Sequence, residues 1–341
     1  MQLDVGGHPL HTRSLSVTLA ARDDGRVDVR GVIVDLRKRG FVPVGGELQP
    51  SGIVHLMSLD ARVDPDTRRV ETIAGAQPNV AFEPTALTHG ESCRDPIGRI
   101  QGLVGATLDA GWARRLSAEI GGPRGCSHVL TLAQLLGSTV AWALDRDRER
   151  FGAAARRDGE RIYRRDVVVD GHELAPGRVA LALQSTDLHQ APAPAIVPSM
   201  KRFGADHVVR GIATVDLGRF ALADVTLAER RRDRATLDTA TWRDRGDVAA
   251  GLAGLGLARG VSGALLARLG DAPADRPLLD ALLMLAPALI QCMAALSDGW
   301  ASMAAAGAWT VGMGGQPDSC WMWRADGPLQ RARRPDEPVG A

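Results

Sequence analysis

Apolar and polar residues alternate through the first part of the chain in the manner of antiparallel strands. Residues 14–21 and 27–35 alternate on either side of the turn Asp23-Asp24-Gly25, which is typical of a β-hairpin. Residues 53–64 and 69–73 show the same alternation and predict a second pair of strands. The pattern therefore predicts a small antiparallel sheet in this region.

The pattern then changes to a helical period. Asp95 followed by Pro96 is typical of a helix start, because the carboxylate can cap the first N–H groups and proline needs no N–H there. The first predicted helix covers residues 96–120 and stops at Gly121-Gly122. A second helix is predicted over residues 128–144.

The first half of the chain returns, degraded, 152 residues later. Twelve residues match at this constant offset: Arg13, Val17, Gly25, Arg26, Val27, Asp35, Leu36, Gly52, His55, Ala61, Val63 and Asp64 correspond to Arg165, Val169, Gly177, Arg178, Val179, Asp187, Leu188, Gly204, His207, Ala213, Val215 and Asp216. Strand-like alternation returns at residues 166–169, 179–186, 208–215 and 221–227. We predict an α+β fold of two pseudo-equivalent halves, each with antiparallel strands followed by two helices, related by an internal duplication.

Four segments follow from this pattern. Residues 1–145 form the first β-then-α repeat, and residues 146–164 a charged helical connector. Residues 165–299 form the second repeat. Residues 300–341 are a Trp-rich C-terminal segment and tail. The duplication matters for function, because a reactive residue present in one half alone is a candidate for chemistry.

Charge and composition exclude some classes of partner. The chain has 41 basic and 40 acidic residues, a net charge of +1, so neither a nucleic acid nor a membrane is expected as a partner. The longest apolar stretch, residues 281–296, is interrupted by Pro287 and Gln291 and is shorter than the roughly 18–20 residues of a membrane span. We expect a buried helix there.

Features of the N-terminus and the cysteines predict a compartment. Residues 1–13 lack the apolar core of a signal peptide. The four cysteines show no CxxC spacing, so reduced thiols and a cytoplasmic location are expected. The two-half pattern is also compatible with a homodimer.

The turn before the second helix carries the first candidate site. Cys126 lies at the predicted helix N-terminus, where the dipole favours a thiolate, and His128 follows as a base or a metal ligand. Cys93 would complete a zinc-binding set with Cys126 and His128, although their spacing fits no standard pattern. A structural capping turn with a buried cysteine is the alternative.

Histidines near strand ends form the second group of candidates. His55 and His207 occupy equivalent positions, and backbone hydrogen bonding at a sheet edge is the alternative to catalysis. Asp35 and Asp187 are also equivalent, but only Asp187 is followed by a histidine, His189. Asp187 and His189 could share a proton, with His189 as the general base. A solvated pair of loop residues explains them equally well.

The Trp-rich segment supplies candidates for substrate binding. Alternation over residues 320–324 places Trp321 and Trp323 on one face of a strand, where indole rings could form the walls of a site for a flat ligand. Arg324 could hold a phenolate or carboxylate through two hydrogen bonds. A strand that closes the core is the alternative. The remaining candidates for substrate contacts are Asp318, Cys320 and Arg94.

These motifs resemble a bacterial domain-of-unknown-function family, family 2889, whose hallmark is a Gly-Cys-Ser/Thr-His-Leu turn. The matching residues are Asp35, Cys93, Leu103, Gly105, Gly111, Trp112, Gly121, Gly122, Gly125, Cys126 and His128. Val129 stands where the family has leucine. The resemblance is good over about residues 10–145. Longer members, which share the ending Asp-Ser-Cys-aromatic-Met-Trp-Arg, resemble phenylcoumaran γ-formaldehyde lyase of lignin-dimer catabolism.

This resemblance implies a carbon–carbon lyase that acts on a small lignin-derived aromatic dimer. General acid–base chemistry through a quinone methide would release formaldehyde and leave a stilbene, with no cofactor. The absence of a GxGxxG or GxxxxGK[ST] loop agrees with that expectation. Two alternatives stay open: a metal- or thiol-dependent hydrolase at Cys93, Cys126 and His128, and a non-catalytic protein that binds a small molecule.

Overall fold

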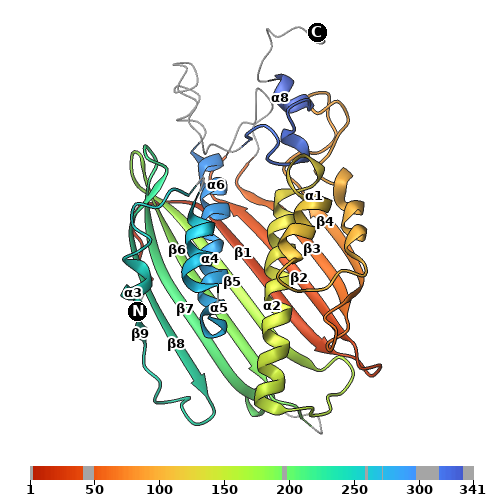
Figure 1. Cartoon of the computed structure of the whole chain (residues 1–341). Coiled ribbons are helices and arrows are strands. Elements are labelled where there is room, and N and C mark those ends of the chain that lie inside the picture. Colours follow the sequence, from red (N-terminus) through yellow and green to blue (C-terminus); the bar gives the residue numbers. More distant parts are fainter. Residues whose placement is uncertain are drawn as a thin grey trace.

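A computed structural model describes residues 3–40, 50–193, 198–257, 260–270, 272–296 and 315–332. Its centre is a nine-stranded antiparallel sheet with the strand order β4-β3-β2-β1-β5-β6-β7-β8-β9 (Figure 1). The bounds of the strands are β1 His8–Ala21, β2 Val27–Arg37, β3 Gly52–Val63, β4 Val70–Asn79, β5 Arg161–Ala175, β6 Arg178–Gln190, β7 Phe203–Asp216, β8 Ala221–Asp233 and β9 Arg243–Asp244. The two strand groups predicted from the sequence therefore join into one sheet through β1 and β5.

Helices cover one face of this sheet. Figure 1 shows α2, α5 and α6 lying across the same face. The α-helices are α1 Trp112–Ile120, α2 Ser127–Phe151, α3 Gly246–Ala249, α4 Val261–Leu269, α5 Arg276–Leu283, α6 Leu285–Ala295 and α8 Pro328–Ala332. Helix α2 packs on β1, β2, β3 and β5, whereas α5 packs on β6 and β7. The molecule is thus a two-layer α+β structure.

Alternation along the strands produces the core. Leu15, Val17 and Leu19 of β1 point toward the helices and are fully buried, and the residues between them are only partly covered. The helices approach the sheet closely at two glycines. A Cβ added to Gly31 would lie 3.2 Å from Leu132 of α2, and one added to Gly171 would lie 2.1 Å from the Cys292 sulfur of α6. Close packing of this kind holds the helix ends near the strand ends.

The single helix predicted over residues 96–120 is wrong. A 3-10 helix covers Asp95–Leu103, and α1 begins only at Trp112. Between them the chain returns to the edge of the sheet. The Gly105 N–H donates to the carbonyl of Val70 at 2.7 Å, and a φ of +88° at Gly105 turns the chain there. A strand-edge contact that periodicity does not reveal thus interrupts the helix.

Two further predictions need correction. The connector 146–164 is helical only as far as Phe151, because Gly152 has a φ of +64° and β5 already begins at Arg161. Residues 320–324 do not form a strand. Trp321–Trp323 form a 3-10 turn, so Trp321 and Trp323 do not share a strand face. Trp300 and Trp309 lie outside the described residues.

The two halves of the sheet have matching local geometry. Arg13 pairs with Asp35 across β1 and β2, and Arg165 pairs with Asp187 across β5 and β6. Arg68 and Phe220, which are 152 residues apart, both have a positive φ, 57° and 48°. The two halves therefore share these local features at positions 152 residues apart.

Two helical stretches are apolar and long enough to cross a membrane by length and composition alone. They are Ser127–Phe151 and Pro273–Ala295. In the structure, 56% and 67% of their most apolar windows are buried inside the protein. The core helices of a soluble protein show the same combination of length, apolar composition and burial.

Candidate functional site

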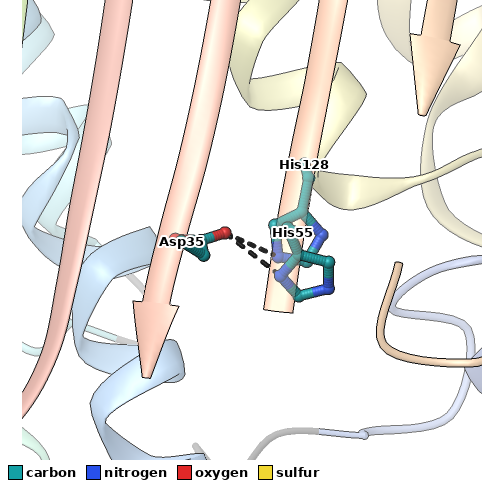
Figure 2. Close-up of side chains that lie close together, drawn as sticks. All are labelled: Asp35, His55 and His128. Carbon is teal, nitrogen blue, oxygen red and sulfur yellow. Dashed lines mark ion pairs between the residues drawn. The ribbon is translucent and has the colours of Figure 1, made fainter. Parts of the chain in front are cut away.

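Three side chains from the first half converge at one end of the sheet. Asp35 lies near the end of β2, His55 is its register partner on β3, and His128 lies in the first turn of α2. Figure 2 shows both rings facing the same carboxylate. The His55 Nδ1 lies 3.2 Å and the His128 Nε2 3.4 Å from the Asp35 Oδ2. Among the described residues, these three form the one group of at least three whose ligand atoms all lie within 4.8 Å of one another.

Arg13 holds the carboxylate of Asp35 in place. Its Nε and Nη2 donate to the two oxygens of Asp35 at 2.8 and 2.9 Å, and both residues are buried. Burial by itself would raise the pKa of Asp35, but the charge of Arg13 holds that pKa well below its usual value. Asp35 is therefore an anion in the interior, with its orientation set by a two-pronged hydrogen bond.

Two of the histidines around Asp35, His11 and His128, have lowered pKa values. The rings of His55 and His128 stack with centroids 3.8 Å apart. Burial lowers the pKa of His128 well below its usual value. His11 of β1 lies 3.5 Å from the Asp35 Oδ1, and burial lowers its pKa to about 3. At neutral pH, His11 and His128 are therefore unprotonated imidazoles beside a carboxylate.

Several nitrogens of this cluster lack a hydrogen-bond partner within the described part of the chain. They are both ring nitrogens of His11, the Nδ1 of His55 and the Nε2 of His128. Buried polar atoms are normally satisfied, since leaving one unpaired costs about 1–3 kcal/mol. Unsatisfied atoms that gather at one point indicate a place where a ligand binds.

Arg37 adds a second positive charge to this end of the sheet. It is buried at the end of β2, directly opposite His11 of β1. Burial lowers its pKa to about 10, which still leaves it protonated at neutral pH. Arg37 therefore places a second guanidinium close to the neutral ring of His11.

The prediction of a thiolate at Cys126 is wrong. Cys126 caps α2 as expected, but its side chain is buried, and burial raises its pKa to about 12. Its sulfur lies 3.7 Å from the Nδ1 of His128 and 4.0 Å from the sulfur of Met57. The cost of burying a charged thiolate exceeds the attraction of the helix dipole. Cys126 is therefore a packing residue beside the cluster.

The predicted zinc set does not form a group of three ligand atoms that all lie within 4.8 Å of one another in the described part of the chain. Only His128 of that set belongs to the group described above, while Cys93 and Cys126 do not. Burial raises the pKa of Cys93 well above its usual value. Its neighbour Arg94 donates to the backbone carbonyls of Gln77 and Pro78 at 2.8 and 2.9 Å. Arg94 therefore ties the loop after β4 to the strand, and its proposed contact with a substrate is not supported.

The Asp187–His189 pair is not formed either. Arg165 donates to both oxygens of Asp187 at 2.7 and 2.8 Å. His189 instead packs against aromatic rings, with its centroid 4.7 Å from that of Tyr163 and 5.4 Å from that of Trp142. Burial lowers the pKa of His189 to about 3. His189 lies two positions after Asp187 and so shares its strand face, but neither ring nitrogen of His189 has a hydrogen-bond partner among the described residues.

Two counterparts of the cluster in the second half have partners within the protein. The Nε2 of His207 lies 2.8 Å from the Oε2 of Glu229 on β8. Asp280 of α5, which lies 152 residues after His128, forms an ion pair with Arg165. The hydroxyl of Ser138 donates to Asp280 as well, at 2.6–2.7 Å. At these two positions the second half has protein partners, whereas both ring nitrogens of His189, the counterpart of Arg37, lack a hydrogen-bond partner among the described residues.

The C-terminal motif lies next to the Cys126 turn. The backbone N–H of Trp321 donates to the carbonyl of Gly125 at 2.8 Å. Arg324 lies over the ring of Trp321, 4.1 Å from its centroid, and forms an ion pair with Glu91. Since Glu91 occupies the guanidinium, the prediction that Arg324 holds a substrate anion is not supported by this geometry.

Other members of the motif have structural contacts. Trp323 packs edge-on against Phe82, with ring centroids 5.7 Å apart. Asp318 has a φ of +61° and accepts a hydrogen bond from the Ala325 N–H at 2.9 Å. Burial raises the pKa of Cys320. The motif thus brings indole rings near the cluster without presenting a ready anion-binding arginine.

A cavity lies elsewhere on the molecule. It has a volume of about 270 Å³ and is lined by residues at the end of β7 and the start of β8, including Asp216 and Leu222, and by Gly254. His207, the counterpart of His55, lies near the other end of β7. The cavity therefore lies at the opposite end of β7 from His207, and none of its lining residues belongs to the cluster.

Sequence reasoning missed His11, Arg13 and Arg37 as parts of the site. A signal for Arg13 was present, because Arg13 and Asp35 are both repeated at the offset of 152 as Arg165 and Asp187. Paired retention of opposite charges on neighbouring strands indicates a contact. His11 and Arg37 carried no such signal, since their counterparts are Tyr163 and His189.

Comparison with known proteins covers the first half. A family model described as a protein of unknown function (DUF2889) matches residues 11–141. This segment contains His11, Arg13, Asp35, His55 and His128. A search of the curated proteins finds no match to the chain. The matched segment runs from β1 into α2 and includes every member of the cluster.

Proposed function

Residues 11–141 belong to the DUF2889 family, and from that premise we propose that this segment carries the active site of an enzyme. The site is the cluster of Asp35, His11, His55 and His128. The observation that carries the proposal is a set of imidazole nitrogens, unpaired within the described residues, around one fixed carboxylate. Neutral imidazoles next to a carboxylate are suited to general acid–base catalysis.

The second half serves as a scaffold in this proposal. We propose that both halves descend from one duplicated unit. The matching Arg–Asp pairs and the repeated positive φ at Arg68 and Phe220 support a common origin. The second unit then lost its reactive groups, since Asp280 and Glu229 satisfy the positions that stay open in the first.

The reaction we propose is carbon–carbon cleavage of a small aromatic dimer with release of formaldehyde. The benzylic ether opens to a quinone methide, and a base removes the proton of the neighbouring primary alcohol. The carbon–carbon bond then breaks, its electron pair restores the aromatic ring as the stilbene double bond forms, and formaldehyde leaves. The sequence needs no oxidant or reductant, because every electron pair stays within the substrate.

His11 is the base with the best position for this proton transfer. Both of its nitrogens lack a partner within the described residues, and the Asp35 Oδ1 at 3.5 Å can stabilise the imidazolium that forms. Arg37, buried opposite His11, favours the phenolate that the departing ether leaves. The Trp321 and Trp323 turn beside Gly125 supplies apolar surface near the cluster.

Turnover of lignin-type dimers that carry a free phenol and a primary alcohol tests this proposal. Purified protein should release formaldehyde and an absorbing stilbene in equal amounts. His11→Gln should lower kcat by about 10²–10⁴-fold, the usual contribution of a general base. The matched control is His207→Gln in the second half, which should keep its activity. Binding of the dimers without either product would favour a non-catalytic binding protein and reject the lyase.

The geometry does not favour a hydrolase that uses the Cys126 thiol as its nucleophile. Burial keeps Cys126 protonated at neutral pH, so attack by its thiolate has no support. Cys126→Ala should therefore leave the rate of any reaction at the cluster unchanged within a few-fold. Loss of all activity in Cys126→Ala, with the fold intact, would restore the thiol as a reactive group.

A further inference from the structure

We propose that Asp35, His55 and His128 bind one divalent metal ion, with zinc as the preferred ion. The ligand atoms are the Asp35 Oδ2, the His55 Nδ1 and the His128 Nε2. The inference deepens the proposed function, and only the role given to the metal in the reaction rests on that function. The binding of the ion itself depends on geometry alone.

The distances between the ligand atoms carry the first argument. Zinc–nitrogen and zinc–oxygen bonds of about 2.0–2.1 Å in a tetrahedral site place two ligand atoms about 3.3–3.4 Å apart. The Asp35 Oδ2 lies 3.2 Å from the His55 Nδ1 and 3.4 Å from the His128 Nε2. The two nitrogens lie within 4.8 Å of each other, so an ion beside this oxygen reaches both once the rings move toward it.

The direction of the two rings carries the second argument. Both nitrogens lie within 3.4 Å of the same oxygen, yet neither has the geometry of a hydrogen bond to it. The His55 side chain is 5% exposed, so water from bulk solvent does not readily satisfy it. Ring nitrogens that approach a carboxylate oxygen but do not point straight at it suit a ligand held between them.

Arg13 fits the part of an outer-shell partner. It binds both oxygens of Asp35 and so orients the carboxylate, leaving a second lone pair of the Oδ2 toward the histidines. Its positive charge opposes a cation at this point, as does that of Arg37. An anionic oxygen in the fourth position of the metal would offset that charge. The site is therefore expected to prefer a metal together with hydroxide or a phenolate.

The second half provides an internal comparison for this argument. The residues that lie 152 positions after the three ligands are Asp187, His207 and Asp280. His207 contacts Glu229, and Asp280 contacts Arg165. These side chains already have partners, so no metal is expected there. The unpaired nitrogens of His55 and His128 therefore lie at positions where the described residues offer no such protein contact.

Coordination would also give the histidines of the cluster different roles. A metal held by His55 and His128 removes both from proton transfer and leaves His11 as the free base. The ion would bind the ether or phenol oxygen of the substrate and stabilise negative charge on it as a Lewis acid. This assignment agrees with the role given to His11 above, and it predicts that loss of a ligand and loss of the base have different signatures.

Metal analysis of the whole chain tests the inference. Protein stripped with a chelator and titrated with Zn²⁺ should bind one equivalent, with a rise in the thermal midpoint. Co²⁺ should give visible bands of the intensity that four-coordinate sites show. His128→Ala should weaken Zn²⁺ binding by more than the about 10–100-fold lost with an outer-shell partner. His128 lies at a helix start with its side chain 12% exposed, so this variant is expected to fold.

Matched variants decide between the outcomes. His207→Ala and Cys126→Ala should retain one equivalent of Zn²⁺, since neither contributes a ligand. His55→Gln serves as a second ligand variant if His128→Ala fails to fold. Zn²⁺ binding that survives in both ligand variants, or no binding by the folded wild-type chain, would overturn the metal site.

The metal site and the lyase fail separately. Chelator-stripped protein that still releases formaldehyde at the full rate would reject the metal and keep the lyase. A chain that binds one Zn²⁺ through His55 and His128 yet turns over no dimer would keep the metal and reject the lyase. A rate restored by Zn²⁺ in the wild type but not in His128→Ala would support both.

Discussion

The two halves of the sheet build the same buried ion pair and surround it in opposite ways. In the first half, Arg13 and Asp35 lie among histidines whose nitrogens have no partner within the described residues. In the second, Arg165 and Asp187 are joined by a second carboxylate, Asp280, and by the Thr139 hydroxyl at 3.2 Å. The first pair is thus flanked by histidine nitrogens without a partner, and the second pair by an additional carboxylate.

This difference shows what turns a structural pair into a candidate site. An Arg–Asp pair across two strands is a stable unit only if its remaining hydrogen-bonding groups are satisfied, because desolvation of the charges is costly. In the second half, Asp280 and Thr139 supply further partners for Arg165, although both ring nitrogens of His189 have none among the described residues. The first half leaves them to a ligand, at a cost in stability that the rest of the fold has to cover.

Removal of each arginine should separate the halves most strongly. Arg165→Met leaves Asp187 and Asp280 buried without their shared cation, and we expect a loss of about 3–5 kcal/mol in the free energy of unfolding. Arg13→Met leaves Asp35 beside imidazoles that can take up a proton, so its loss should be smaller, below about 3 kcal/mol. Urea unfolding at pH 7 measures both. Equal losses would mean that the histidines do not compensate.

Acid should weaken the first half more than the second. Burial lowers the pKa of His11 to about 3 and that of His128 well below its usual value, whereas His189 is the one such histidine among the described residues of the second half. The unfolded chain takes up protons below about pH 6.5 that these sites refuse, so stability falls as the pH drops. Each site contributes up to about 1.4 kcal/mol per pH unit.

Unfolding in urea between pH 7 and pH 5, with a chelator present, checks this expectation. The double variant His11→Gln, His128→Gln should flatten the pH dependence about twice as much as His189→Gln. The lowered pKa values of Asp35 and Asp187 act in the same direction but only below about pH 4, where their stabilising charges are lost. A pH dependence unchanged in the double variant would contradict neutral histidines at the cluster.

Two helix glycines give the smallest contrast. A Cβ at Gly137 of α2 would lie 2.1 Å from the Trp112 Nε1, so Gly137→Ala should destabilise the protein by about 1–3 kcal/mol. Gly263 of α4 is exposed and has no atom within 4 Å of the added Cβ. Gly263→Ala should stabilise it by about 0.5–1 kcal/mol through helix propensity. Thermal unfolding measures both, and the same sign in the two variants would contradict the packing described for α2.

Local patterns predicted the strands well and the helices less well. Alternation located β1 to β8, because each residue of a half-buried strand shows its face directly. The helix over residues 96–120 was wrong because Gly105 leaves the helix to pair with Val70. Residues 320–324 were wrong because Trp321 is held by the Gly125 carbonyl in a turn. Neither contact leaves a trace in short-range periodicity.

The sequence by itself determined the strand pattern, the repeated Arg–Asp pair and the candidates His55 and His128. Only the tertiary structure decided that Asp35 joins those two histidines, that His11 lies beside them, and that Asp187, Cys126, Arg94 and Arg324 are occupied or buried. The physical reason is the separation along the sequence of the residues that interact. Strand periodicity depends on neighbouring residues, whereas a site depends on which side chains the sheet register and the helix packing bring together, and on which of them remain unsatisfied.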